Sequence, residues 1–598
     1  MSKLGNYIDG KFVAPESENL RDVLSPHDGK VVRCVVESTA EDVKAAVKCG
    51  ADAFEKWSLL SSKERAAKLL LMYHAIEQHL DELAGIISLE SGKSRVEAVA
   101  ELREGMEVLR WAAALPYQSR ARQQQLSDGL VCQESRRAVG VVVAITPFCS
   151  PVLAPLWTIP LALVLGNCVI LKPSSRAPSA MVRVLELMDK SWLSAAGAGS
   201  DPCLPPGVLQ IIHGNCDIAL DLCKQPDVRA VTFVGGTQGA QGVYHYGSGM
   251  SRRVMALGTL RNIVLALPDC DTDRAAAQVV GSFTHCAGQS AMAARLLLLV
   301  GGSRDSPLLQ KILEGVGALG GKGGQVGPMI DKASYGRAVT TVRQAAARGG
   351  ELLVDGTDPN TGWGTGTAPS APFFLGPTVV LLSEWTEEQV VCAGPVLLVY
   401  CPATREEAVA IERANPHGNA ACVFTESGTA ADWFLRRLNA SLVGVNSTHP
   451  RTAGPFCYGG QLGLSQFGYP GGGEAAEDFF SDRVLTASAW TGYSVGERAE
   501  PTNPNPNAEP LPARATVSVT VSLPSLPCPT INTARAAPEA AKEADRASQA
   551  AQAQVQGITL AQGMGMGQAN WKPNPNRAEF VPGAQRAPTP TPTPTPTP

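Results

Sequence analysis

Two neighbouring residues have the types needed for nucleophilic catalysis. Cys286 follows His285 directly, and a thiol beside an imidazole can become a thiolate that attacks a carbonyl carbon. Adjacent residues in a helix or strand point to different faces, however, so the two side chains are not expected to pair. Cys286 remains a candidate nucleophile, and a small buried core thiol is the alternative.

A glycine-rich turn is the second candidate site. Gly235, Gly236 and Gly239 follow the apolar run AVTFV at 230–234. Such a turn brings the backbone close to a dinucleotide at the start of a helix, where free N–H groups face its phosphates. A tight turn with a purely structural role is the alternative, and the pattern alone does not decide between them.

The elements that must position these residues alternate along the chain. From residue 139 onward, helical segments separate apolar runs, namely GVVVAIT, CVILKP, GVLQIIHG, AVTFVGG, NIVLALPD, ARLLLLVG, TVVLL and PVLLVYCPA. This alternation predicts parallel sheets with crossover helices, an α/β fold. Helical spacing with charged outer faces also predicts surface helices over 41–57 and 62–90.

Composition excludes several classes of partner. The 598 residues are 44% apolar, which predicts a globular chain of several domains. A net charge of -4 leaves no basic surplus for nucleic acid or an anionic membrane surface. Residues 139–171 carry no charge until Lys172, but Pro147, Pro151, Pro155 and Pro160 argue against a membrane span. Two buried strands flanking one helix are expected there instead.

The cysteines and the chain ends suggest location and organisation. The 15 cysteines form no CxxC pair and no zinc-like cluster, so reduced thiols in the cytoplasm and no metal site are expected. The start, MSKLGNYIDGKF, has neither a signal core nor a presequence pattern. Segments 194–202 and 358–372 have the composition of loop insertions. After Trp490, Pro, Ala, Asn and Thr predict a disordered, polyproline-like tail.

Several runs, in order, resemble the aldehyde dehydrogenase family. TPFCSPVLAPLWTIPLALVLGNCVILKPS is similar to the core of that family. PLWTIPLA, GNCVILKPS and PPGVLQIIHG are similar to its methylmalonate-semialdehyde dehydrogenases, as are GPTVV, AGPVLLV, NPHGNAACVFT and LVGVN. The resemblance covers about residues 4–490, and many ordered matches carry it.

The resemblance implies an aldehyde dehydrogenase-like fold in three parts, followed by the tail. The parts are a doubly wound nucleotide-binding domain (1–125 and 141–256), a second α/β domain of the catalytic type (257–465), a small β oligomerisation extension (126–140 and 466–490), and the tail (491–598). The extension would join subunits into a homodimer or homotetramer, or into a hetero-oligomer with an active paralogue.

The same resemblance implies NAD-dependent oxidation of a semialdehyde to an acyl-CoA. A cysteine thiolate attacks the aldehyde, an Asn side chain and a backbone N–H hold the oxyanion, and hydride leaves to NAD. Coenzyme A then attacks the thioester. In this chain Ala291 stands where that cysteine is expected, and Cys149 stands where the oxyanion Asn is expected. Cys286 lies five residues earlier, and reaction geometry tolerates a displacement of only about one ångström.

Other expected site positions also carry different residues. Ser290 replaces the Arg before the nucleophile, and the general-base position falls on Ala256 or Leu257. The Glu-x-Phe-Gly-Pro motif is changed, with its residues here being Val391, Cys392, Ala393, Gly394 and Pro395. Cys457, in a loop similar to the family's substrate-pocket lining, is expected to have a packing role.

The nucleotide site is better preserved. The positions that the resemblance assigns to NAD are Thr146, Pro147, Phe148, Lys172, Ser175, Gly235, Gly236 and Gly239. Lys172 matches the lysine that bonds the adenosine ribose hydroxyls, whereas Ser175 stands in place of the acidic residue that shares this task.

Three functions follow. One is an active CoA-acylating dehydrogenase that works through Cys286. The second, which the losses around Ala291 favour, is an impaired or inactive member that acts as a nucleotide-binding or structural subunit. The third is an interaction protein whose Pro-rich tail recruits partners with aromatic-lined grooves.

Overall fold

All described helices and strands belong to the first of two compact units of the computed structural model, Met1–Glu497; the second unit is Arg498–Pro598. The structure describes residues 3–13, 19–119, 121–127, 130–196, 203–259, 261–320, 326–358, 371–386, 393–418, 420–448, 454–457 and 463–489. The predicted tail, Val391 and most of the two predicted loop insertions lie outside these residues.

The larger sheet has eight strands. Across the sheet they are β20 (Gln466–Gly468), β12 (Arg253–Leu257), β11 (Val228–Val234), β8 (Val141–Ile145), β9 (Cys168–Lys172), β10 (Leu209–Ile211), β2 (Tyr7–Ile8) and β3 (Lys11–Phe12). The strands from β12 to β10 are parallel. The chain runs from β8 towards β10 on one side and from β11 to β12 on the other, so the strand order reverses between β8 and β11. Open α/β sheets bind ligands beside such a reversal, at the carboxyl ends of the strands.

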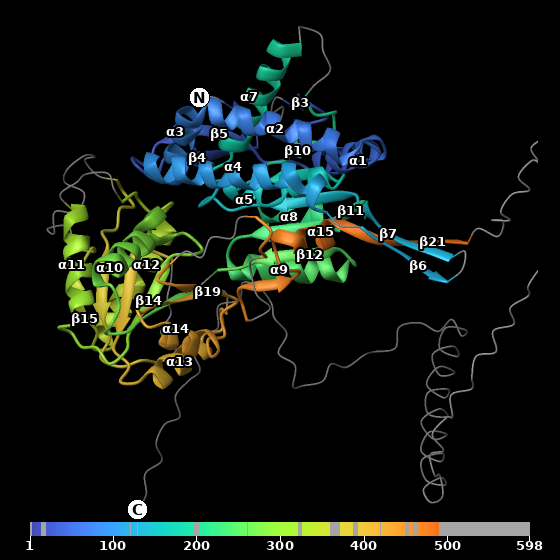
Figure 1. The fold of residues 1–598 in the computed structure, drawn as a ribbon. Coiled ribbons are helices and arrows are strands. Elements are labelled where there is room, and N and C mark those ends of the chain that lie inside the picture. Colours follow the sequence, from blue (N-terminus) through green and yellow to red (C-terminus); the bar gives the residue numbers. More distant parts are fainter. Residues whose placement is uncertain are drawn as a thin grey trace, which may run out of the picture. The chain divides into compact units, whose positions relative to one another are not determined.

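Helices cover both faces of this sheet (Figure 1). Val141 and Val143 of β8 are buried against the helices of one face, and Val142 and Ala144 against those of the other. The first face has α1 (Ala40–Trp57), α8 (Cys216–Lys224) and α9 (Thr237–Gly249). The second has α2 (Ser62–Gln78), α3 (Leu80–Ser91), α4 (Arg95–Gln118), α6 (Ile159–Val164) and α7 (Ser179–Ala196). Because both faces are buried, the strand sequences are apolar without alternation.

Two predicted helices are each divided in the structure. The segment 62–90 forms α2 and α3, separated at His79, whose φ of -125° and ψ of 28° are not helical. The single helix expected between β8 and β9 is two short ones, α5 (Leu153–Leu156) and α6. Pro160 lies in the first turn of α6, where its missing N–H costs no helical hydrogen bond, so a new helix begins there.

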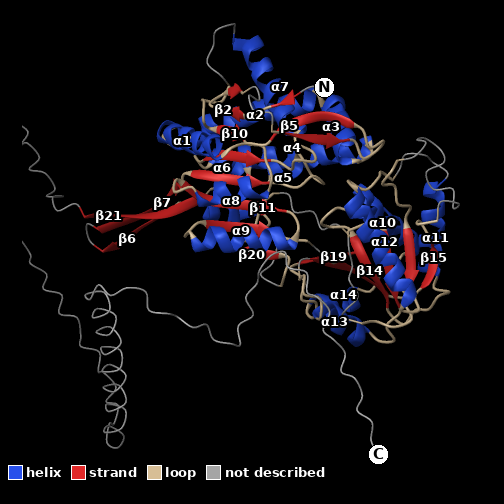
Figure 2. Cartoon of the chain, turned by 180° about the vertical axis from the view of Figure 1, so that it is seen from behind, coloured by secondary structure: helices blue, strands red, loops and turns tan. Residues whose placement is uncertain are grey.

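The second large sheet has seven strands and also has helices on both faces (Figure 2). Its order is β15 (Glu351–Val354), β16 (Thr378–Leu381), β17 (Val396–Tyr400), β14 (Ala294–Leu299), β13 (Asn262–Ala266), β18 (Ala420–Phe424) and β19 (Leu442–Val445). The helices α10 (Thr272–Thr284) and α11 (Pro307–Gly320) pack on one face, and α12 (Lys332–Ala347), α13 (Arg405–Arg413) and α14 (Gly428–Leu435) on the other. The predicted alternation of parallel strands and crossover helices is confirmed.

Two smaller sheets complete the described fold. One contains β1 (Lys3–Leu4), β5 (Val31–Val36) and β4 (Leu20–Leu24). In the other, β7 (Leu130–Ala138) pairs with β6 (Arg122–Ser127) and with β21 (Ser481–Ala489), which follows α15 (Gly473–Phe480). The domain boundaries given above stay a prediction. Among the described helices, none is both long and apolar enough to cross a membrane.

A buried ion pair fixes the segment that follows β8. Lys93 Nζ lies 2.6 Å from Glu101 Oε2 of α4, and both side chains are almost fully buried. Glu101 Oε1 accepts hydrogen bonds from the backbone N–H groups of Val152 and Leu153, at 2.9 and 3.1 Å. Burial alone would lower the pKa of Lys93, but the Glu101 carboxylate holds it above its usual range.

We expect Glu101→Gln to lower the free energy of unfolding by about 3–5 kcal/mol, because the amide leaves the Lys93 charge buried without a counter-charge. Urea denaturation measures this loss. Glu107→Gln is the matched control, since its pair with Arg110 is half-exposed. That variant should change stability by less than about 1 kcal/mol. Equal effects for the two variants would contradict the role assigned to the buried pair.

Candidate active site and nucleotide site

The residues assigned to the nucleotide meet at one edge of the eight-stranded sheet. Thr146 follows β8, Lys172 ends β9 and Gly235 follows β11, so parallel pairing brings them to the same edge. The Thr146 N–H donates to the Lys172 carbonyl at 3.1 Å, whereas the buried Thr146 hydroxyl has no partner. His213, two residues beyond β10, lies at this edge too. Sequence reasoning did not predict a role for His213, although its position after the predicted strand in GVLQIIHG could have indicated one.

Lys172 is a buried cation without a carboxylate partner among the described residues. Its ammonium group donates to the Pro173 carbonyl at 3.2 Å, and burial lowers its pKa to about 8. Ser175, where an acidic residue was expected, donates its hydroxyl to the Gly214 carbonyl at 3.1 Å. The site therefore has an ammonium group, but it lacks the acidic residue that the resemblance expects to bond the ribose together with this lysine.

His213 is a second unpaired group beside Lys172. Its side chain is 1% exposed, and neither ring nitrogen has a well-formed hydrogen bond within the described structure. Burial lowers its pKa to about 3, with the nearby Lys172 charge acting in the same direction and a smaller effect of the Gly5 backbone opposing it. The imidazole is thus neutral near pH 7 and keeps one N–H donor and one acceptor nitrogen available.

The three glycines of the turn differ in their surroundings. A side chain at Gly235 or Gly239 would come within 2.7 Å of the Phe233 ring, so these two glycines are needed for packing. At Gly236, the nearest atom to an added Cβ would be Thr259 Oγ1 at 3.9 Å. Gly236 caps the start of α9 without a side chain, and the N–H of the next residue, Thr237, donates to Thr259 Oγ1 at 3.2 Å.

Phe148, which follows Thr146 and Pro147, has Arg176 as a neighbour. The Arg176 guanidinium group lies 5.9 Å from the centre of the Phe148 ring. It also pairs with Asp331 at 2.6 Å, the residue that caps α12. Arg176 therefore links the nucleotide edge of the first sheet to a helix of the second.

The segment before the expected nucleophile forms a left-handed turn, His285–Gly288. The φ angles of Cys286, Ala287 and Gly288 are 52°, 50° and 63°. For residues with a Cβ this conformation costs roughly 1–2 kcal/mol each. Such strain persists only where neighbouring contacts impose it.

Glu97 of α4 supplies the main contacts that impose this turn. Its Oε1 accepts from the Cys286 N–H at 2.8 Å and lies 3.1 Å from His285 Nδ1, while its Oε2 accepts from Ser94. Gln289 adds two more bonds, from its amide to the Cys286 carbonyl and from the Ile330 N–H to its oxygen, both at 3.0 Å. His285 thus pairs with a carboxylate and not with its neighbour Cys286. Sequence reasoning missed Glu97, which lies far away in the chain.

The segments around Gly288 and Gly394 contact each other through their backbones. The Gly394 N–H donates to the Gly288 carbonyl at 3.2 Å, and a Cβ at Gly288 would lie 1.9 Å from the Gly394 oxygen. Buried Arg295 donates to the Gly394 carbonyl at 3.1 Å and to the Ser290 carbonyl at 3.3 Å. Glycine is therefore required at position 288 whether or not a nucleophile follows.

Ala291 follows the turn that these contacts hold and is partly buried, and its methyl group can neither attack an aldehyde nor form a thioester. Beside it, the Ser290 hydroxyl accepts from the Met292 N–H at 3.3 Å. Ala256 is fully buried in β12, and Leu257 uses its carbonyl to accept from the Gly235 N–H at 3.0 Å. Neither side chain can move a proton.

The nearby thiols are unsuited to replace the missing one. Cys286 is 2% exposed, and burial raises its pKa well above its usual range despite the opposing Lys93 charge. Burial also raises the pKa of Cys149. Reactive thiols need a lowered pKa and access to substrate, and Cys286 has neither.

Other cysteines and metal ligands offer no replacement in the described residues. The packing role predicted for Cys457 is wrong, because it is exposed next to Phe456, itself 70% exposed. The loop backbone contacts the start of α15, where the Glu474 N–H donates to the Pro455 carbonyl at 3.2 Å, but the Cys457 side chain is exposed. Within the described part of the chain, no three His, Cys, Asp or Glu side chains gather as a metal ion would require.

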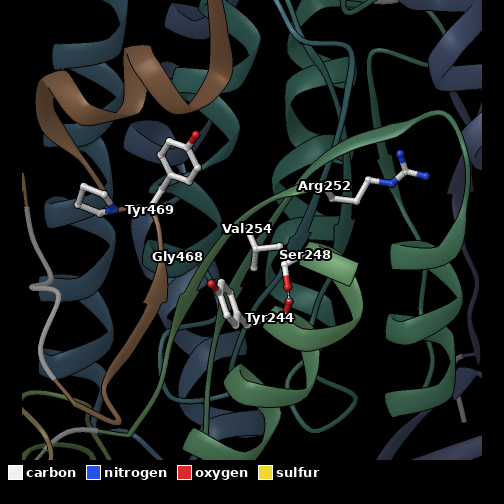
Figure 3. A pocket seen from close by; sticks show the side chains of 7 residues that line it. Tyr244, Ser248, Arg252, Val254, Gly468 and Tyr469 are labelled. Carbon is white, nitrogen blue, oxygen red and sulfur yellow. Dashed lines mark hydrogen bonds between the residues drawn. The ribbon is translucent and has the colours of Figure 1, made fainter. Parts of the chain in front are cut away.

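A separate hollow of about 350 Å³ lies at the sheet edge formed by α9, β12 and β20 (Figure 3). It is lined by Tyr244, Ser248, Arg252, Val254, Gly468, Tyr469 and Pro470. The Arg252 guanidinium group points away from the two tyrosines and donates to the Gln225 carbonyl at 3.0 Å. None of the residues predicted for catalysis or nucleotide binding lines this hollow.

Known proteins resemble the chain over nearly all of its described length. The aldehyde dehydrogenase family pattern matches residues 12–485. A malonate-semialdehyde dehydrogenase of Geobacillus thermodenitrificans is 30% identical over 498 residues, 81% of this chain and 99% of that protein.

Solved structures agree with this match. Methylmalonate-semialdehyde dehydrogenase from Oceanimonas doudoroffii has a TM-score of 0.76 at 29% identity, covering 83% of this chain and 100% of its own. A Sinorhizobium meliloti protein, assigned as a methylmalonate-semialdehyde dehydrogenase and solved with NAD, has a TM-score of 0.75 at 28% identity, covering 82% and 99%. The predicted fold class is confirmed.

We expect Glu97→Gln to destabilise the protein by about 3 kcal/mol at pH 7. Burial opposes ionisation of Glu97, but its bonds to His285 and Cys286 lower its pKa to about 2, from 4.5. A carboxyl with a lowered pKa stabilises the fold above pH 4.5, and this contribution is lost as the pH falls towards 2. The difference between variant and parent should therefore shrink over that range in urea denaturation.

Glu64→Gln is the matched control for this measurement. Glu64 forms the same capping box, with Ser61, but on the surface and without the two further bonds of Glu97. A pH-independent Glu97 effect, or an equal effect at Glu64, would argue against the tie to the turn.

Lys172→Met should stabilise the protein at pH 7 by about 1–3 kcal/mol. The folded protein bears the cost of a buried ammonium below pH 8, and this cost is relieved as the pH rises from about 8 to 10.5, where the unfolded lysine also loses its proton. The advantage of the variant should therefore disappear over that interval in urea denaturation. Lys44→Met, on the exposed side of α1, is the control and should show no such pH dependence. A destabilised Lys172→Met variant would show that the buried ammonium is not a cost to the fold.

Proposed function

Since the chain belongs to the aldehyde dehydrogenase family, we propose that it binds an adenine dinucleotide of the NAD type but does not form the thioester on which that family's chemistry depends. The supporting observation is the distribution of unpaired polar groups. At the carboxyl ends of β8 to β10, the Thr146 hydroxyl has no hydrogen-bond partner among the described residues, and neither His213 nitrogen has a well-formed one. In the turn before Ala291, the polar groups of Glu97, Gln289 and Arg295 bond to the protein itself.

The residues present fit the adenosine end of the dinucleotide. Lys172 would hold the ribose, and the backbone at Gly236 would face the phosphates at the start of α9. Bound NAD would supply a hydride acceptor. A bound dinucleotide also gives the unpaired groups partners that the protein alone does not supply, which favours binding.

The chain's own residues do not support the first chemical step. Ala291 brings no thiol, and Cys286 is buried, protonated near neutral pH and fixed by its backbone bond to Glu97. Without a thioester, coenzyme A has no bond to attack. A nucleotide-holding subunit, in a homo-oligomer or beside an active paralogue, is the role that fits.

The alternative is an active semialdehyde dehydrogenase. It is favoured by the relative that is 30% identical, a malonate-semialdehyde dehydrogenase. It requires Cys286 to leave its buried turn and lose its proton.

The test is to incubate the full chain with NAD, coenzyme A and a panel of aldehydes that includes malonate and methylmalonate semialdehydes. We expect NAD to raise the melting temperature, corresponding to about 2.7 kcal/mol when its concentration is a hundred times its Kd. We expect no NADH and no covalent mass shift. NADH formation that Cys286→Ser abolishes would establish the alternative, and no thermal shift would remove nucleotide binding.

Two gain-of-function variants test whether the turn still has the geometry that the reaction needs. Ala291→Cys restores the thiol, and adding Cys149→Asn restores the oxyanion donor. The double variant should form a covalent adduct about a hundredfold faster than Ala291→Cys alone, since one oxyanion donor has about that effect. Equal labelling of the unaltered chain would contradict the proposal.

A further inference from the structure

Two cysteines that the proposed function does not use lie beside the same buried cation. The ammonium group of Lys93 interacts electrostatically with the thiols of both Cys149 and Cys286. Burial raises the pKa of each thiol, and the Lys93 charge opposes this rise in both cases. Both thiols are free. Two thiols far apart in the chain thus share one positive charge.

Helix α4 brings the segments of these two cysteines together. Glu97 Oε1 accepts from the Cys286 N–H at 2.8 Å. Glu101 Oε1 accepts from the Val152 N–H at 2.9 Å, three residues after Cys149. Residues four apart on a helix lie on the same face, with their Cβ atoms about 5–6 Å apart. The two carboxylates are therefore neighbours, and the backbone segments that they bind lie side by side.

The electrostatic interactions of Cys286 indicate that the two thiols are close to each other. Burial has the largest effect on the pKa of Cys286, followed by the opposing charge of Lys93. Of the negative groups that raise this pKa, Cys149 has a larger effect than Glu97. The Glu97 carboxylate already contacts the Cys286 N–H. Because a charge acts more strongly at shorter range, Cys149 belongs to the immediate surroundings of the Cys286 thiol.

The two thiols differ in their access to solvent. Cys149 is partly exposed, whereas Cys286 is 2% exposed. A pair of this kind is oxidised in two steps, because an accessible thiol meets the oxidant and a neighbouring thiol then resolves the product. The resolving thiol needs no access of its own to solvent. Burial, which makes Cys286 unsuitable for attacking a substrate, does not prevent this second role.

We propose that Cys149 and Cys286 form a reversible disulfide that ties the segment after β8 to the turn before Ala291. The oxidant is a small organic disulfide of the glutathione type. The Cys149 thiolate attacks one sulfur of this oxidant, whose S–S bond breaks, and one thiol leaves. The Cys286 thiolate then attacks the Cys149 sulfur and releases the second thiol. The two cysteines lose two electrons and two protons, and the oxidant gains them. This inference does not depend on nucleotide binding.

Cys49 and Cys168 provide a comparison within the same chain. Their charges also interact, and both thiols have a raised pKa, chiefly through burial. The Cys49 thiol donates to the Asp9 carboxylate at 3.2 Å, however, which retains its proton. Disulfide exchange requires the thiolate. We therefore expect no cross-link between Cys49 and Cys168 under conditions that link Cys149 to Cys286.

The test is to incubate the reduced full chain with excess oxidised glutathione, block the remaining thiols with iodoacetamide and map the peptides by mass spectrometry without reduction. We expect two peptides joined through Cys149 and Cys286, which dithiothreitol separates. The link should form faster as the pH rises, because both thiols must lose their protons. The exposed residues Cys216 and Cys457 should carry glutathione, which shows that the oxidant has reacted with the chain.

Cys286→Ala is the variant that isolates the second step. Cys149 should then keep its glutathione, because no second thiol displaces it, and the link should be lost. Cys422→Ala is the matched control, since Cys422 is as buried as Cys286 and its pKa is raised by burial alone. That variant should form the link as the unaltered chain does. Melting temperatures of the reduced variants confirm that each is folded.

Three results would overturn the inference. The first is a Cys149 that keeps its glutathione in the unaltered chain. The second is a Cys149 that stays unmodified while Cys216 reacts. The third is a link between Cys49 and Cys168 in place of the proposed one. Each would show that the thiols of Cys149 and Cys286 do not reach each other.

Discussion

Two carboxylates one turn apart on α4, those of Glu97 and Glu101, hold both loops on which the family's chemistry would take place. Glu101 binds the backbone after β8, where Cys149 lies, and Glu97 binds the backbone of the turn before Ala291. A buried carboxylate lowers the stability of the fold unless its oxygens have partners. The backbone bonds that each loop donates to these carboxylates are therefore costly to break. The geometry of the site thus depends on α4 and hardly at all on the residues that would react.

This dependence explains how the site can lose its chemistry and keep its shape. The left-handed turn is imposed by Glu97, by Gln289 and by the contact between Gly288 and Gly394. None of these contacts involves the side chain at position 291. Replacing a thiol by a methyl group at that position removes reactivity without removing a structural bond, so Ala291 is compatible with an intact fold.

The strands that follow residue 139 could be predicted from the sequence because buried parallel strands are continuous apolar runs. The breaks at His79 and between α5 and α6 could not, since helical spacing continues across them. Glu97 and Arg295 were missed for a different reason. Each acts through a partner distant in the chain, as Glu97 does with a residue 189 positions away, and composition or spacing carries no trace of such a pair. The substitution at Val391 stays a prediction, because it lies outside the described residues.

The contrast between the two ends of the site is the strongest physical argument about function. A buried polar group without a partner costs free energy, so a fold tolerates it where a ligand supplies the missing bond. Thr146 and His213 are such groups, and Lys172 is a buried charge held by one carbonyl. Around Ala291, by contrast, the polar groups form hydrogen bonds within the protein. The first set is therefore available to a ligand, whereas the second set already holds the turn before Ala291. This contrast between the adenosine end and the reacting end supports the proposed function, nucleotide binding without thioester formation.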